Sequence, residues 1–105
     1  MQDDRTGQIA VIFTSTRTAR DPDGYARAAA AMDALAAAQP GYRGVDSART
    51  GDFGITVSWW ADEASAVAWR EHPIHATIRA AGRDRWYSDY AVAVAQVSRA
   101  YRWRA

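Results

Sequence analysis

The order of strand-like and helix-like segments along this 105-residue chain limits it to a small set of folds. Residues 8–16 (QIAVIFTST) have the alternating apolar pattern and the β-branched residues of a strand. Residues 42–50 and 53–60 are two further strand-like runs, and the short glycine-containing link between them predicts a hairpin. Residues 90–101 (YAVAVAQVSRAY) open with an apolar run and predict the last strand.

Two helices are expected between these strands. The alanine-rich segment 25–39 has apolar residues at helical spacing and follows a turn whose aspartates can cap a helix. A second helical pattern covers residues 61–82, and we expect Pro73 to break it because proline has no N–H to donate. The polar residues 84–90 (DRWYSDY) predict a loop before the last strand.

The resulting order, strand–helix–strand–strand–helix–strand, is that of the ferredoxin-like βαββαβ unit. This α+β fold has an antiparallel sheet with both helices on one face. The length is typical of one domain, so we expect residues 1–105 to form a single unit.

Two helices cover only one face of such a sheet, and the other face needs a cover of its own. The pairing as read places Thr56, Ser58 and Trp60 on the bare face, or the opposite set if the register shifts by one residue. The first and last strands are apolar on both faces, so either choice exposes apolar side chains. We therefore predict a homodimer that buries sheet against sheet.

Composition excludes several classes of function. The 13 basic residues, all arginine, nearly balance 12 acidic residues, so no nucleic-acid partner is expected. The absence of cysteine excludes disulfides and thiol catalysis. No apolar run approaches 18 residues, and the polar N-terminus does not resemble a secretory signal. The sequence predicts a cytoplasmic protein without a membrane segment.

The only two histidines of the chain lie close together in the segment WREHPIH, residues 69–75. A helical wheel places Val67, Ile74 and Ile78 in an apolar stripe facing the core, with Trp69 on the opposite side. Three polar residues form a second stripe beside the core: His72, His75 and Arg79.

A metal site is the least favoured interpretation of this stripe. The histidines are three residues apart rather than four, and the chain has no cysteine or third histidine to complete a ligand set. Two alternatives stay open. The histidines either serve a structural or surface role, or they transfer protons or donate hydrogen bonds in a pocket, a role that a pKa near neutrality suits.

Aromatic residues gather in the second half of the chain and allow two interpretations. Packing in the core or in a dimer interface accounts for most of them. A ligand pocket lined by flat rings is the alternative, and Trp86 and Tyr87 are its stronger candidates because they fall in the expected polar loop.

Five segments spread over nearly the whole chain resemble the antibiotic biosynthesis monooxygenase superfamily, and more narrowly a bacterial subgroup of small members. The resemblance implies a dimeric α+β barrel, in which two ferredoxin-like protomers join sheet to sheet and each keeps a pocket between helices and sheet. The segments are FTSTRT (13–18), QPGYRGVDSART (39–50), ITVSWWADE (55–63), AWREHPIH (68–75) and GRDRWYSDY (82–90).

The resemblance also implies a chemistry. Members that oxidise polycyclic aromatics use no metal or flavin, and their deprotonated substrate reacts with dioxygen itself. We therefore expect a cofactor-independent monooxygenase for an aromatic or quinol-type small molecule, with no cofactor. His72 or His75 would act as general base and Arg79 would stabilise the substrate anion. The expected pocket residues are Ser15, Trp69, Trp86, Tyr87 and Tyr90.

Haem-degrading members of the superfamily use an axial histidine, a tryptophan and an asparagine. The resemblance places Trp69 at the tryptophan position, Arg79 at the histidine position, and Thr14 or Ser15 at the asparagine position. Haem degradation is therefore less favoured, although His72 or His75 could ligate haem from another angle. A dimer that binds a small molecule without catalysis is the other alternative to the monooxygenase.

Overall fold

Four strands form one antiparallel sheet in the order β2-β3-β1-β4 in the computed structural model, which describes residues 4–105. The central strand β1 (Ile9–Arg17) pairs with β3 (Phe53–Trp60) on one side and with β4 (Tyr87–Gln96) on the other. The hairpin expected from the sequence joins β2 (Tyr42–Thr50) to β3. This is the α+β ferredoxin-like topology that the order of segments predicted.

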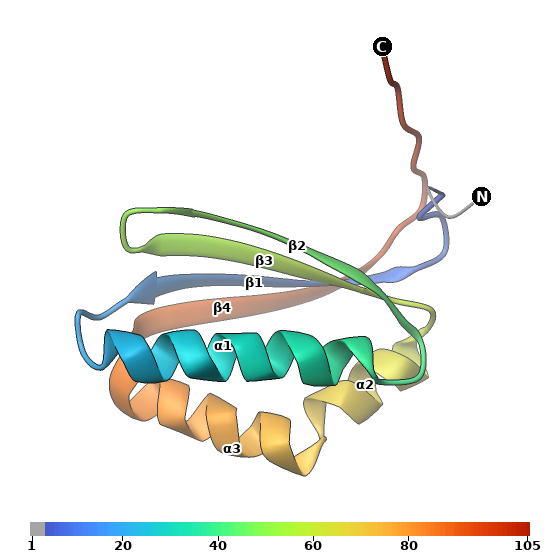
Figure 1. Cartoon of the computed structure of the whole chain (residues 1–105). Helices are drawn as coiled ribbons and strands as arrows, with labels where there is room; N and C mark the ends of the chain where they lie inside the picture. The colour runs from blue at the N-terminus through green and yellow to red at the C-terminus, as the bar shows by residue number, and fades with distance from the viewer. Residues whose placement is uncertain (1–3) are drawn as a thin grey trace.

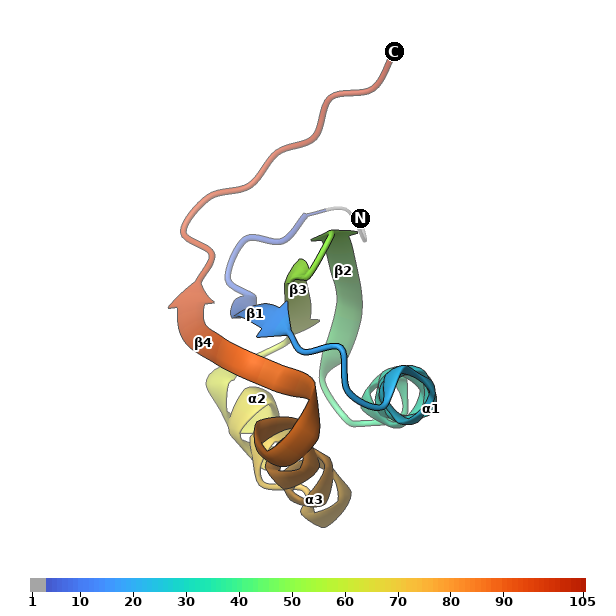
Figure 2. The ribbon, with the colours of Figure 1, turned by 90° about the vertical axis from the view of Figure 1, so that its left-hand side faces the viewer.

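The helices all lie on one face of the sheet (Figure 1). α1 (Pro22–Ala37) runs along one side, and α2 (Glu63–Arg70) and α3 (Pro73–Ala81) run along the other side (Figure 2). The break between α2 and α3 falls at Pro73, as expected. No helix within residues 4–105 is long and apolar enough to cross a membrane.

The loop predicted for residues 84–90 is wrong. Residues Gly82–Trp86 form a π-helical turn, η1, and β4 begins directly after it at Tyr87. Tertiary contacts override the polar composition here, because the amide of Thr18 donates to the carbonyl of Trp86 and Tyr87 pairs with Arg17. The last strand accordingly spans Tyr87–Gln96 rather than residues 90–101.

The first of the two predictions for the bare face of the sheet, with Thr56, Ser58 and Trp60 on that face, is also wrong. Trp60 is fully buried on the helix side, where its ring stacks on Trp69 of α2. Because side chains alternate along a strand, Thr56 and Ser58 share that face, and both line the space beneath the helices. The side chains on the bare face of β3 are instead those of the alternative register, shifted by one residue, that the sequence left open. They are Phe53, Ile55, Val57 and Trp59.

The helical wheel failed for α2 and α3. Trp69, expected to face away from the core, is buried, whereas Val67 and Ile74 of the expected core stripe are 42% and 51% exposed. The wheel took Val67 as the centre of the core face, whereas the buried residues of α2 are Ala66 and Trp69. The break at Pro73 in addition gives α3 a phase of its own. The buried cluster is built instead from Ile9, Ala36, Trp60, Ala66 and Trp69.

We predict that Trp60→Ala destabilises the fold far more than Trp103→Ala, a matched change at an 80% exposed ring. Loss of the buried Trp60 ring should cost about 3–5 kcal/mol of unfolding free energy. The Trp103 change should stay within about 0.5 kcal/mol. Urea unfolding followed by circular dichroism measures both, and equal losses for the two variants would contradict this core assignment.

Candidate functional site

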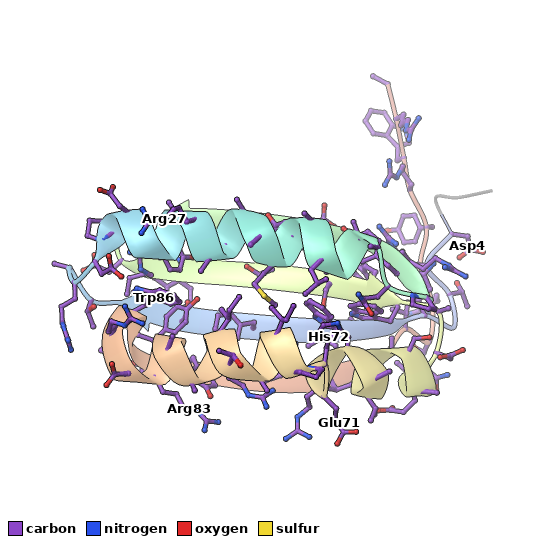
Figure 3. The ribbon with its side chains drawn as sticks, turned by 60° about the horizontal axis from the view of Figure 1, so that its bottom comes forward. Asp4, Arg27, Glu71, His72, Arg83 and Trp86 are labelled. Carbon is purple, nitrogen blue, oxygen red and sulfur yellow. The ribbon has the colours of Figure 1, made fainter. Side chains whose placement is uncertain are left out.

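A cavity of about 850 Å³ lies between the sheet and the helices. Its floor includes Val11, Phe13 and Ser15 of β1, all on the helix-facing side of the strand. Residues of α1 line it on one side, and residues of α2, α3 and η1 line it on the other. Figure 3 views the molecule from this helical side, with β1 running between the two rows of helices.

The cavity exists because α1 presents small side chains to the sheet. Ala28, Ala29 and Ala36 line it together with the larger Met32. An alanine cannot reach the sheet from the axis of a helix, so the space under α1 stays open where larger apolar residues would fill it. The alanine-rich composition of this helix thus creates a site that could hold a small molecule.

His75 lies in the wall of this cavity and is held in one orientation. Its ring stacks on Trp69, with centroids 4.5 Å apart and planes 28° apart. The Nδ1 atom lies 2.9 Å from the backbone carbonyl oxygen of Trp69. A carbonyl only accepts hydrogen bonds, so Nδ1 carries the proton and Nε2 of the neutral ring has a free lone pair.

The surroundings of His75 favour this neutral form. Burial of the ring lowers the pKa of His75 below its usual value, and the positive charge of Arg79 lowers it further. The hydrogen bond to the carbonyl of Trp69 acts in the opposite direction, with a smaller effect than burial. Near pH 7 the imidazole is therefore neutral and can accept a proton through Nε2.

His72 has a different place. Its Nδ1 accepts a hydrogen bond from the amide of Ile74 at 3.2 Å, so the side chain caps the N-terminus of α3. It is not among the residues that line the cavity. The segment HPIH thus combines a helix cap, a helix-starting proline and one cavity residue, and the structure separates the two histidines that the sequence treated alike.

The remaining residues expected at the site all line this one cavity. Arg79 lies one helical turn beyond His75, and its guanidinium donates to the carbonyl of Arg70 at 3.2 Å. Ser15 is 2% exposed on the cavity floor. The aromatic residues of the prediction, Trp69, Trp86, Tyr87 and Tyr90, complete the set.

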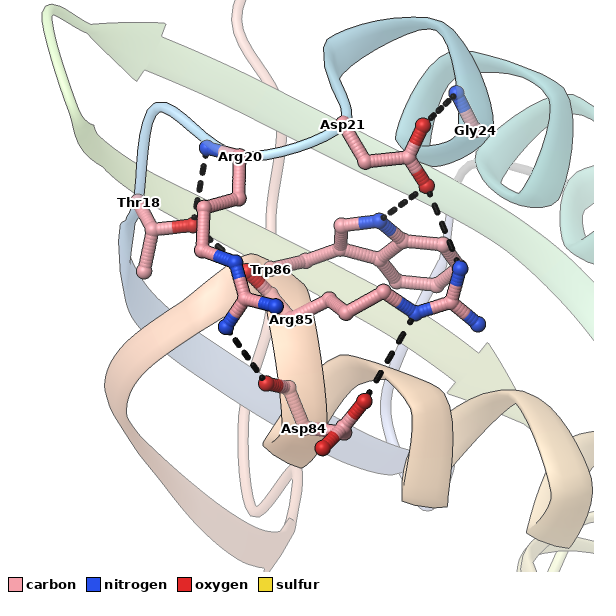
Figure 4. Close-up of polar contacts among 7 residues, drawn as sticks. All are labelled: Thr18, Arg20, Asp21, Gly24, Asp84, Arg85 and Trp86. Carbon is pink, nitrogen blue, oxygen red and sulfur yellow. Dashed lines mark hydrogen bonds and ion pairs between the residues drawn. The ribbon is translucent and has the colours of Figure 1, made fainter.

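One end of the cavity is closed by a polar network between η1 and the turn before α1 (Figure 4). The indole N–H of Trp86 donates to the Asp21 carboxylate at 3.2 Å, and Arg85 pairs with the same oxygen at 3.4 Å. The bond from Trp86, followed by that from the Gly24 amide, lowers the pKa of Asp21. Trp86 is thereby fixed as an end wall, with 5% of its surface exposed.

Three residues at this end escaped the sequence analysis as site candidates. Tyr25 and Arg49 line the cavity, and Arg17 lies over the ring of Tyr25 at 3.4 Å from its centroid. They come from α1, β2 and β1, so no local motif links them. The alternation of β1 placed Arg17 on the same face as Ser15 and was the only available signal.

The sequence matches the family model for antibiotic biosynthesis monooxygenases over residues 9–81. It is 46% identical over 91 residues to the uncharacterised protein YqjZ of Bacillus subtilis, a match that covers 86% of this chain and 79% of YqjZ.

Solved structures share the fold at low sequence identity. A variant of SnoaB, a cofactor-independent oxygenase from Streptomyces nogalater, superposes with a TM-score of 0.77 at 14% identity, over 90% of this chain and 97% of SnoaB. A conserved protein from Methanosarcina mazei gives a TM-score of 0.79 at 8% identity, over 89% of this chain and 95% of the other. These structures show the fold alone, and the match to the family model establishes that the chain belongs to the antibiotic biosynthesis monooxygenase family.

Proposed function

We propose that this protein is a cofactor-independent monooxygenase that oxidises an aromatic or quinol-type small molecule in the cavity. The proposal rests mainly on His75, a neutral base that Trp69 orients in the wall of an aromatic-lined cavity. The fold shared with SnoaB, which is described as a cofactor-independent oxygenase, supports the proposal.

The proposed reaction begins with proton transfer. For a substrate with an activated CH2 group, Nε2 of His75 removes one proton, and the positive charge of Arg79 stabilises the resulting anion. The anion gives one electron to dioxygen, and the substrate radical combines with superoxide to form a peroxide anion. This anion takes the proton back from Nε2 of His75 and becomes a hydroperoxide. Loss of water from the hydroperoxide leaves a carbonyl, so that CH2 and O2 become C=O and H2O.

The cavity walls assist by holding the substrate ring away from bulk water. Trp69 and Trp86 both line this space and are only 8% and 5% exposed. In such a partly dry site the charge of Arg79 acts on the substrate anion more strongly than it would in water.

We predict that His75→Ala lowers turnover by about 10²-fold or more, because it removes the base. The matched change His72→Ala should leave turnover close to wild type and lower the unfolding free energy by about 1 kcal/mol, because it removes only the helix cap. Oxygen consumption and product formation with polycyclic phenols and quinols measure the first effect, and urea unfolding measures the second.

Equal turnover of the two histidine variants would remove His75 from the role of base. A wild-type protein that binds aromatic ligands but consumes no oxygen with any of them would favour a non-catalytic binding function instead. A shift of the Soret band on titration with haem would favour the haem-binding alternative.

The depressed pKa of His75 leads to a prediction on pH dependence. Only the neutral imidazole accepts a proton, so kcat/KM should fall as the pH drops through the pKa of His75. The midpoint of this acidic limb of the pH–rate profile should lie below the usual pKa of histidine. Arg79→Gln removes a neighbouring positive charge and should move the limb to higher pH. Rate profiles between about pH 4 and 9 test this, and an unmoved limb in the variant would contradict it.

We further propose that two copies associate through the bare face of the sheet. On this face the large apolar residues Phe53 and Ile55 of the inner strand β3 are 48% and 41% exposed, and a cluster of such residues marks a surface that another molecule covers. Trp59 on the same face is partly covered by Arg5, whose guanidinium lies 4.6 Å from the ring centroid. A second copy would cover the remainder with the same apolar surface.

We predict that Ile55→Glu converts the dimer into monomers, because it buries a charge in the interface. The control is Ile74→Glu, which places the same charge on α3 at a residue that is 51% exposed and lies outside the cavity lining. Light scattering coupled to gel filtration measures the mass of each variant. A dimeric Ile55→Glu protein would show that the association uses another surface.

A further inference from the structure

Two arginines and two tyrosines meet at the end of the cavity that Trp86 closes. The Arg17 guanidinium carbon lies 3.4 Å from the centroid of the Tyr25 ring. An Nη atom of Arg49 donates to the Tyr25 hydroxyl at 3.3 Å. The rings of Tyr25 and Tyr87 meet edge to face with centroids 6.1 Å apart. Four elements, β1, α1, β2 and β4, thus bring two positive charges and two hydroxyls to one place.

Gly54 makes room for this arrangement. It is buried in β3 with ordinary strand geometry, so its backbone does not require glycine. A Cβ atom at this position would lie 2.5 Å from the Arg49 guanidinium. The missing side chain therefore lets Arg49 lie across the sheet and reach Tyr25, while the Asp52 carbonyl accepts a second bond from it at 2.9 Å.

The positive charge at this end is not compensated by the protein. Within residues 4–105, neither Arg17 nor Arg49 forms an ion pair with a carboxylate. The Nε atom of Arg17 is buried and has no hydrogen-bond partner in the same part of the chain. Two guanidiniums beside the same ring without a counter-charge are an environment that an anion would stabilise. Arg17 is not among the cavity-lining residues, so it contributes its charge and not a hydrogen bond to the ligand.

We propose that this end of the cavity binds a carboxylate or similar permanently anionic oxygen group carried by the aromatic ligand. Arg49 and the Tyr25 hydroxyl contact the anion from the cavity wall, and Arg17 adds charge from behind the Tyr25 ring. The inference rests on the proposed ligand site and narrows it to aromatic acids. The ligand rings then extend from this end toward His75.

Two further observations fit an acidic ligand. Burial, and after it the neighbouring Tyr25, raises the pKa of Tyr87, so this hydroxyl adds no negative charge beside a bound anion. The charged residues that line the cavity are four arginines (Arg49, Arg70, Arg79 and Arg83) and two carboxylates (Asp33 and Glu63), and none of these arginines forms an ion pair with a carboxylate within residues 4–105. The excess of positive charge would attract a negatively charged molecule to the cavity.

The test compares two fluorescent probes that share the same rings. Anilinonaphthalene sulfonate carries a permanent anion, and phenylnaphthylamine lacks it. The wild-type protein should bind the sulfonate about tenfold or more tightly than the neutral probe, because charge-assisted hydrogen bonds add to the same ring contacts. The preference should weaken with added salt. Unlabelled aromatic carboxylates should displace the sulfonate probe.

Three variants locate the effect. Arg49→Gln should abolish the preference for the sulfonate without changing the affinity for the neutral probe. Gly54→Ala keeps the charge of Arg49 but forces its guanidinium away from Tyr25, and should act in the same direction. Arg27→Gln makes the same charge change at an exposed position of α1 outside the cavity lining (Figure 3) and should keep the preference.

Equal affinity of the wild-type protein for the two probes would overturn the anion site and leave the aromatic cavity standing. An equal loss in Arg49→Gln and Arg27→Gln would also overturn it, because the effect would then be one of overall charge. Absence of binding of either probe would overturn both the ligand cavity and the anion site within it.

Discussion

The stacking of Trp60 on Trp69 is the contact on which both the core and the candidate site depend. The two rings lie 6.0 Å apart with planes 25° apart, and Trp60 at the end of β3 is fully buried. This contact attaches α2 to the sheet. The same Trp69 then orients His75 with its ring and its backbone carbonyl. A residue that holds the fold together therefore also sets the tautomer of the proposed base, so damage to the core at this point should reach the site directly.

The rest of the helical layer is attached more sparsely, and the cavity is the result. α1 presents alanines to the sheet, so little apolar surface is buried beneath it. At the opposite end from Trp60, the indole of Trp86 ties η1 to Asp21 in the turn before α1. The space for a ligand thus lies between two contacts that attach the helices to the sheet, one made by Trp60 and the other by Trp86. Between the two tryptophans the alanines of α1 leave the space open, and Phe13 and Met32 are among the larger side chains that line it.

The sequence was a reliable guide to topology because strand and helix periods and the proline break are local signals. It was a poor guide to which face of α2 is buried. The wheel centred the core face on Val67, whereas Ala66 and Trp69 are the buried residues of this helix, and the break at Pro73 gives α3 a separate phase. The segment 84–90 reads as polar, yet its pairing with β1 makes part of it a strand. The hydrogen bond between Arg49 and Tyr25 could not be predicted from the sequence, because it depends on the space that Gly54 leaves in β3.

The proposed base and the proposed anion site make compatible demands on the cavity. Positive charge near His75 favours its neutral form, which is the form that accepts a proton. In the empty cavity this charge, acting with burial, keeps His75 unprotonated, although it also makes Nε2 a weaker base. A bound anion would offset part of that positive field and so make Nε2 of His75 more basic when a ligand is present. Placing the ligand's negative charge at the Tyr25 end thus ties proton removal to correct binding, because a neutral molecule in the same cavity would leave His75 the weaker base.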